Sequence, residues 1–92
     1  MTVLDEILDI EEARWREMPF TEIVQNLGDV NCYDKHHKGS EYQFEVHTKK
    51  GKSNDEIIIM VEGSKKSFFG KCRYFAKAKD ESIREIDGDE AF

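Results

Sequence analysis

The sequence has no long hydrophobic run and contains little cysteine. None of its 92 residues falls in a stretch approaching the ~18 apolar residues that a membrane-spanning helix requires. The N-terminal residues mix Asp5, Glu6 and Asp9 with apolar side chains and have no basic region before an apolar core, so they do not match a secretory signal peptide. The two cysteines, Cys32 and Cys72, then favour reduced thiols over a disulfide framework. These absences predict a cytoplasmic protein with no membrane segment.

Motifs of phosphate-binding or nucleophilic enzymes are also missing. The sequence has no glycine-rich phosphate loop, no nucleophile elbow and no paired-acid motif. Cys32, Asp34 and His36 supply the residue types of a thiol nucleophile site, but neighbours this close on a strand or turn do not face each other as that chemistry requires. A domain of this length also has little core in which to form a deep pocket. We therefore expect no enzymatic activity and no cofactor.

The spacing of cysteine and histidine gives little support for a metal site. Zinc sites use thiolate or imidazole ligands, commonly in paired C-x2-C or H-x3-H elements. Only Cys32 and His36 approach such spacing, and the remaining candidates are His37, His47 and Cys72. We expect packed or exposed side chains at these positions and no bound metal.

The first 28 residues have the period of two helices. Thr2 and Asp5 resemble a capping box, and Pro19 ends the first helix because it has no backbone N–H to donate. Gly28 is placed to close the second helix. The apolar positions with helical spacing are Leu4, Ile7, Leu8, Trp15 and Met18, then Phe20, Ile23, Val24 and Leu27.

After Gly28 the pattern changes to that of strands. Residues 41–48 and 67–78 alternate, residues 57–61 are continuously apolar, and residues 30–37 are a weaker candidate. The fold class predicted is α+β, with an N-terminal amphipathic helix broken at Pro19 and packed on a three- or four-stranded antiparallel β-meander. Residues 1–79 form the domain, and residues 80–92 form an acidic, flexible tail. The predicted core is Leu4, Ile7, Leu8, Trp15, Phe20, Ile23, Leu27, Tyr42, Phe44, Val46, Ile57, Ile59, Val61 and Tyr74.

Charge is segregated along the chain. Residues 1–34 carry nine acids and two bases (−7), residues 35–79 eleven bases and five acids (+6), and residues 80–92 six acids and one base (−5). The total of −6 disfavours general coating of nucleic acid but leaves local patches possible. The molecule is thus expected to have a basic sheet between acidic ends.

One face of the last predicted strand combines aromatic and basic residues. Aromatic rings can stack on unpaired bases, and lysine or arginine can neutralise phosphates. Alternatively, one phenylalanine packs under a helix and the lysines form a solvated edge. This predicted interaction face consists of Lys65, Lys66, Phe69, Lys71, Arg73, Phe75 and Lys77.

Two functions remain open at the level of sequence. The preferred one is a non-enzymatic protein-interaction module, whose partner is an unidentified protein or a second copy paired through an edge strand. The acidic helix, with Glu6, Asp9, Glu12 and Glu17, could attract a basic partner or could simply be solvated. The alternative is single-stranded nucleic-acid binding through Phe69, Lys71, Arg73 and Phe75.

Overall fold

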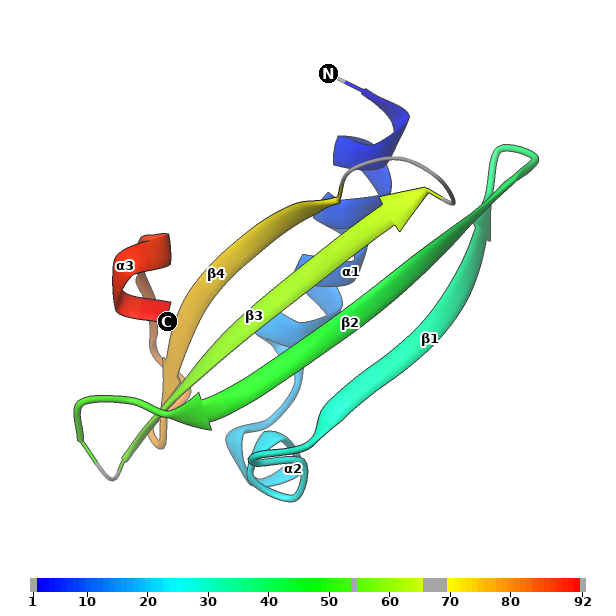
Figure 1. Cartoon of the computed structure of the whole chain (residues 1–92). Helices are drawn as coiled ribbons and strands as arrows, with labels where there is room; N and C mark the ends of the chain where they lie inside the picture. Colours follow the sequence, from blue (N-terminus) through cyan, green and yellow to red (C-terminus); the bar gives the residue numbers. More distant parts are fainter. Residues whose placement is uncertain (1, 54, 66–69, 92) are drawn as a thin grey trace.

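The computed structural model describes residues 2–53, 55–65 and 70–91. Within them the chain forms α1 (Val3–Glu17), α2 (Phe20–Val24), β1 (Val30–His37), β2 (Ser40–Lys50), β3 (Glu56–Lys65), β4 (Lys71–Ala78), β5 (Ile83–Glu85) and α3 (Gly88–Ala91) (Figure 1). The strands form one sheet in the order β1-β2-β3-β4-β5, and each neighbouring pair is antiparallel. The predicted α+β class and antiparallel meander are confirmed. The strand count exceeds the three or four predicted, because β5 pairs with β4.

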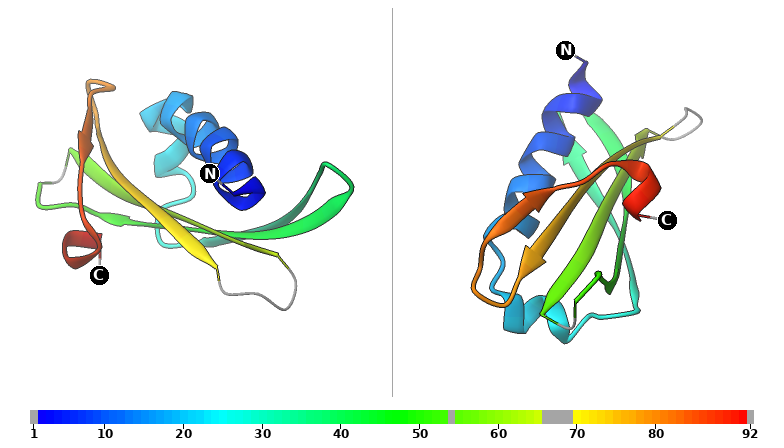
Figure 2. Two further views of the ribbon diagram at one scale, coloured as in Figure 1. Left: turned by 90° about the horizontal axis from the view of Figure 1, so that it is seen from above. Right: turned by 90° about the vertical axis from the view of Figure 1, so that its left-hand side faces the viewer.

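Helix α1 lies in the hollow of a curved sheet. The Thr2 hydroxyl accepts from the Asp5 N–H at 3.1 Å, and the Asp5 carboxylate accepts from the Thr2 N–H at 3.2 Å, so the predicted capping box is present. The helix ends at Glu17, shortly before Pro19. Figure 2 shows α1 on the concave side of the sheet and α3 on the opposite side. We call the side that carries α1 the helix face and the other side the open face.

The β1–β2 hairpin determines which side chains share a face. Lys38 and Gly39 have φ angles of 51° and 80°, as a two-residue type I′ turn requires. The resulting register places Tyr33 opposite Phe44. Because opposed residues of antiparallel strands point to the same side, these two rings stack on the helix face, with centroids 5.5 Å apart. Odd-numbered residues of β1 therefore point to the helix face, and even-numbered residues point to the open face.

The main core lies between the two N-terminal helices and the helix face. It contains Ile7, Leu8, Trp15, Phe20, Ile23, Tyr42, Phe44, Val46, Ile57, Ile59, Val61 and Phe75. Leu4 and Leu27 are only partly buried against it. Placing Tyr74 in this core was wrong: Tyr74 packs against a separate cluster, and Phe75 occupies the main core. Alternation along β4 is compatible with either side of the strand facing the helix. Because Phe75 alternates with basic residues, its side of the strand was expected to face solvent.

Gly63 permits close contact between α1 and the sheet. A Cβ atom at this position would lie 2.7 Å from Cε1 of Phe44 and 3.0 Å from Cδ2 of Leu8. Both neighbours are buried core side chains, so neither can move away easily. The absence of a side chain at Gly63 is thus a packing requirement of the helix–sheet interface.

The segment 80–92 contributes structure to the sheet. Residues Ile83–Glu85 form β5. The short helix α3 packs on the open face, where Ala91 forms a small apolar cluster with Ile58 and Ala76. The sequence pattern predicted no strand here. The flexibility predicted for this segment stays a prediction. Among the described residues, none of the helices is long and apolar enough to cross a bilayer.

Candidate functional site

The predicted interaction face lies largely against α1. Phe75 has an exposed fraction of 0% and belongs to the main core, where the Arg16 guanidinium lies 4.8 Å from its ring centroid. Its ring is therefore not available to stack on a base. Lys65 is exposed at the end of β3, whereas Lys66 and Phe69 fall outside the described residues.

Lys77 is a buried structural cation. Its side chain is buried, and its Nζ donates hydrogen bonds to the backbone oxygens of Arg16 at 2.6 Å and Met18 at 2.7 Å. Glu81 lies 3.4 Å away and supplies the opposite charge. These carbonyls lie at the end of α1, where Pro19 interrupts the helical ladder, and a cation is favourable at a helix C-terminus. The position of Lys77 is thus explained by capping of α1.

Lys71 and Arg73 pair with the acidic side of α1. Lys71 Nζ lies 3.0 Å from Asp5 Oδ2, and Arg73 reaches Asp5 at 3.2 Å, Asp9 at 2.7 Å and Glu12 at 3.5 Å. The hydrogen bond from Lys71, with those from Thr2, holds the pKa of Asp5 well below its usual range. The acidic N-terminal block and the basic strand block therefore neutralise each other inside the molecule.

The acidic C-terminal block is paired in a similar way. Glu85 lies 2.7 Å from Arg16, and Arg84 bridges Glu56 and Glu90. The hydrogen bond from Arg16 lowers the pKa of Glu85, and the one from Arg84 lowers the pKa of Glu90. Among the described residues, the pairs that join acids of this block to bases of residues 35–79 are Lys77–Glu81 at 3.4 Å and Lys52–Glu90 at 3.9 Å.

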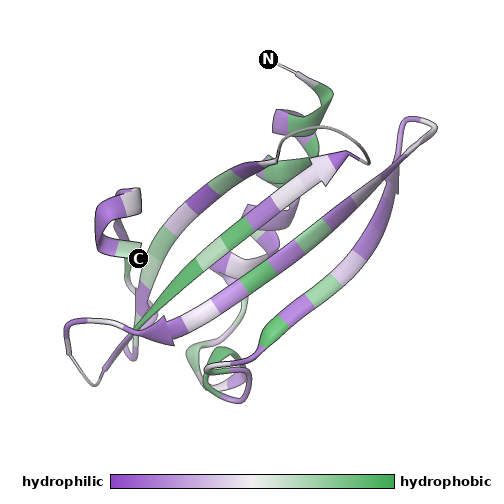
Figure 3. Ribbon diagram, viewed as in Figure 1, coloured by the Kyte–Doolittle hydropathy of each residue, from purple (hydrophilic) through white to green (hydrophobic). Residues whose placement is uncertain are grey.

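The open face carries acids that are not paired in this way. We call Asp34, Glu41, Glu45 and Glu62 the acidic cluster; they lie on β1, β2 and β3. None of the four forms an ion pair with any of the described residues. Figure 3 shows hydrophilic residues on β1 and β2 toward the hairpin that joins them, and hydrophobic residues in the first part of β3.

Two members of the acidic cluster face each other directly. Glu45 is the cross-strand partner of Glu62, and their outer neighbours in the same row are Cys32 and Cys72. The thiols are 3.9 Å from Glu45 and 3.7 Å from Glu62, so among the described residues each carboxylate has only a weak donor beside it. Like charges directly opposed across strands destabilise a sheet. Within the part of the chain that the structure describes, the row is consequently a region of negative charge without an ion-pair partner.

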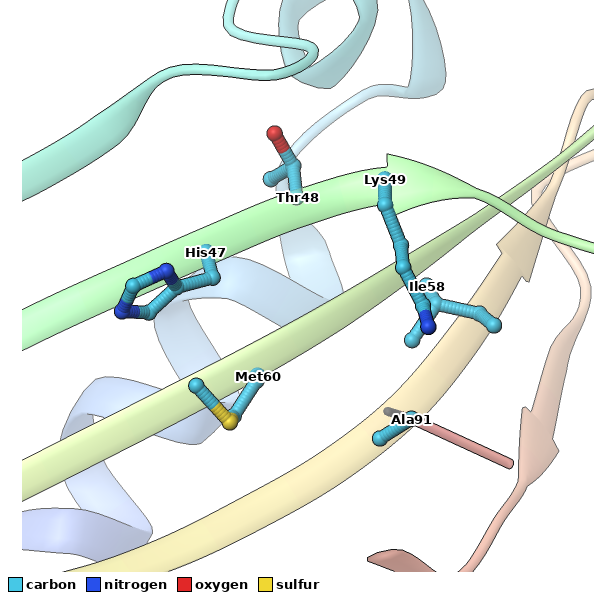
Figure 4. Close-up of a pocket in the computed structure, with 6 residues that line it drawn as sticks. All are labelled: His47, Thr48, Lys49, Ile58, Met60 and Ala91. Atoms are coloured by element: carbon cyan, nitrogen blue, oxygen red, sulfur yellow. The ribbon is translucent and has the colours of Figure 1, made fainter. Parts of the chain in front are cut away.

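A groove adjoins this row on the open face (Figure 4). Its volume is about 330 Å³, and it is lined by His47, Thr48, Lys49, Ile58, Met60 and Ala91. The hydroxyl of Thr48 bonds to the backbone oxygen of Asn26 at 2.7 Å, on the side away from the groove. The lining is therefore mostly apolar, with an imidazole and an ammonium group at its margin.

The metal and nucleophile candidates are not assembled. Cys32 and His36 share the open face but are four strand residues apart, roughly 13 Å along β1. His37 points to the other face, where its Nε2 lies 3.0 Å from Glu6. Burial, followed by the charge of Glu62, raises the pKa of the Cys72 thiol. No group of three or more histidine, cysteine or acidic residues is arranged to hold a metal within residues 2–53, 55–65 and 70–91.

Sequence reasoning found only part of the open face. Glu41 and Glu45 alternate with Tyr42 and Phe44, so their common side could be read from the sequence. Joining Glu62 to Glu45 required the β2–β3 register, which the sequence does not display. Compared with protein-family models, with curated proteins and with solved structures, the chain has no match in any of the three.

Proposed function

We propose that the protein is a non-enzymatic protein-interaction module that binds a basic segment of a partner protein on the open face of its sheet. The observation that carries the proposal is the contrast between paired and unpaired acids. Asp5, Asp9 and Glu85 have basic partners inside the molecule, whereas the acidic cluster has none among the described residues. Its negative charge is therefore available to an approaching cation.

The adjoining groove adds a second requirement for the partner. Ile58, Met60 and Ala91 form an apolar lining next to the row that contains Glu45 and Glu62. A segment that places a lysine or arginine over the carboxylates can therefore insert an apolar side chain into the groove. Complementary charge mainly increases association rate and specificity, and burial of an apolar side chain adds affinity.

The absence of enzymatic activity is part of the proposal. A nucleophilic cysteine needs a lowered pKa and an adjacent base. The pKa of Cys72 is raised instead, and the carboxylate of Glu62 beside it favours the neutral thiol. Free thiols at Cys32 and Cys72 are also compatible with the reducing environment of the cytoplasm, where we propose the protein resides.

Single-stranded nucleic-acid binding is the less favoured alternative. It would require Lys71 and Arg73 to exchange their carboxylate partners on α1 for phosphates, without help from the buried ring of Phe75. The acidic cluster on the other side of the sheet would repel phosphates. No contact that the described residues make on the helix face favours this function over the structural role of these bases.

The proposal is tested with a fluorescein-labelled lysine-rich peptide that carries one leucine, titrated by anisotropy at low and moderate salt. We expect binding that weakens with salt and that falls several-fold in the Glu45→Gln, Glu62→Gln double variant. Replacing the peptide's leucine by serine should also weaken binding. The matched control is Asp29→Asn, which removes an exposed carboxylate outside the open face.

The same titration separates the two functions. Unchanged peptide binding in the double variant, or no peptide binding at low salt, would reject the open face as the binding surface. Labelled single-stranded DNA and RNA serve as competing probes. Salt-sensitive binding of either, lost in a Lys71→Glu, Arg73→Glu variant, would support the nucleic-acid function instead.

A further inference from the structure

The outer edge of β1 is a long strand edge with no neighbour. β1 spans eight residues, lies at one end of the strand order, and pairs with β2 in an uninterrupted register from Val30 to His37. It contains no proline and no bulge, two features that commonly protect edge strands. At the opposite edge, β5 has only three residues. β5 covers only Phe75–Lys77 of β4, so β1 is the longer uninterrupted edge among the described strands and the one better suited to accept another strand.

We propose that two copies of the chain associate through antiparallel pairing of their β1 strands, with Tyr33 at the two-fold axis. This contact lies on the edge of β1 and involves one member of the acidic cluster, Asp34; Glu41, Glu45 and Glu62 lie on β2 and β3. The contact would join the two sheets into one continuous sheet, with both α1 helices on the same side.

Symmetry restricts the register of such a pair. A two-fold axis through an antiparallel strand pair makes one residue face its own copy. Centring on Asp34 would oppose two carboxylates, and centring on Lys35 would oppose two ammonium groups, both unfavourable. Centring on Cys32 would leave Lys35, His36 and His37 beyond the strand residues of the partner. Centring on Tyr33 pairs residues 30–36 in full and opposes no like charges.

This register brings together two sets of charges that have no ion pair among the described residues of one chain. It places Lys35 opposite Asn31 of the second copy, with both side chains on the helix face. Asn31 lines a groove of about 500 Å³ that also contains Glu17, Glu22 and Arg14, whose guanidinium lies 3.6 Å from Glu11. Neither carboxylate forms an ion pair with the described residues of its own chain, and Lys35 forms none either.

Lys35 has little to hold it in the single chain. Its Nζ lies 5.8 Å from the Tyr33 ring centroid, and the Arg14 guanidinium lies 5.2 Å from the same ring. Two cations therefore lie near one aromatic ring, and neither distance is that of an ion pair. Moving Lys35 toward the groove of the second copy brings it near two carboxylates, Glu17 and Glu22, and one guanidinium, Arg14, so the contact is net attractive, and the two-fold axis repeats it.

Sedimentation equilibrium over a range of protein concentrations tests the association. We expect a reversible dimer whose dissociation constant rises about tenfold or more in Lys35→Glu. The triple variant Lys35→Glu, Glu17→Lys, Glu22→Lys restores the charge match and should restore the dimer. Lys79→Glu, at the β4–β5 turn, is the matched control and should leave the dimer unchanged.

Disulfide trapping tests the register. In the proposed pairing Cys32 lies directly opposite residue 34 of the second copy, at a Cα separation of about 4.5–5.5 Å, which a disulfide can span. The two Cys32 residues are offset along the strands and lie too far apart. Mild oxidation should therefore cross-link Asp34→Cys in a Cys72→Ser background but not Cys72→Ser alone.

Three results would overturn the inference. A monomer at every concentration would reject the association, and a dimer insensitive to Lys35→Glu would reject the charge contact. Cross-linking of Cys72→Ser through Cys32 would reject the register. Peptide binding measured on Lys35→Glu remains a separate test of the open face, since that variant keeps the acidic cluster.

Discussion

Replacement of Lys77 by methionine tests the role assigned to the buried cation. Methionine has a similar length and fits an apolar environment, but it cannot donate to the backbone oxygens of Arg16 and Met18. A buried hydrogen-bonding group left without a partner costs about 1–3 kcal/mol. Two lost partners, partly offset by the greater hydrophobicity of methionine, lower the free energy of unfolding by about 2–4 kcal/mol.

Such a loss is large for a domain of this size. Natural domains have a total stability of about 5–15 kcal/mol, so the midpoint of thermal unfolding should fall by more than about 10 °C. Urea unfolding followed by tryptophan fluorescence gives the free energy, because Trp15 lies in the main core. Lys71→Met is the control on the same side of β4. Its side chain is half-exposed, and exposed ion pairs contribute little. If Lys77→Met were as stable as the unmodified protein, the capping of α1 by Lys77 would be contradicted.

Three further predictions concern packing and pH. Gly63→Ala should lower the free energy of unfolding by about 1–3 kcal/mol in urea unfolding, because the added methyl group overpacks the α1–sheet contact, and unchanged stability would contradict that contact. Ile59→Asp should abolish folding, since Ile59 has no exposed surface and a buried unpaired carboxylate costs several kcal/mol; a folded variant by circular dichroism would reject the core assignment. The pKa of Asp5 is lowered by Lys71 and Thr2, and that of Glu6 by Lys38 and His37, so these carboxylates contribute stability that is complete above their usual pKa values and is lost as pH falls below about 4. Equal stability at pH 7 and pH 3 would contradict these pairings.

The elements of the fold could largely be predicted from the sequence. The helical spacing of Ile7, Leu8 and Trp15 and the break at Pro19 each leave a local signal, and the structure has a helix where they indicate one. Alternation in residues 41–48 likewise identifies the face of β2 that carries Tyr42 and Phe44. These signals are local because they arise from the period of one element against one core.

The side of β4 that faces the helix could not be predicted in this way. Phe75 and Tyr74 are both aromatic neighbours in an alternating strand, so periodicity alone does not choose between them. The choice depends on a long-range match, in which Arg73 and Lys77 meet acids and carbonyl groups of α1. The segregation of acids in residues 1–34 and bases in residues 35–79 is consistent with this match. The sequence alone, however, made a solvent-exposed position for the basic side of β4 equally reasonable.

The strand β5 and the acidic cluster were missed for a related reason. Ile83–Glu85 is only three residues long, and its place in the sheet comes from pairing with β4. Glu62 joins Glu45 only through the register between β2 and β3. Both features depend on pairing between distant segments, which composition and local pattern do not specify.

The division of the sheet into a structural helix face and an accessible open face is tested most directly by amine labelling of the folded protein. Limited acetylation followed by peptide mass spectrometry compares the lysines under identical conditions. We expect Lys77 to react far more slowly than Lys49 and Lys79, which are exposed, and to become equally reactive after unfolding in urea. Acetylation of Lys77 in the folded protein at the rate of Lys79 would contradict this division and would return the basic side of β4 to solvent.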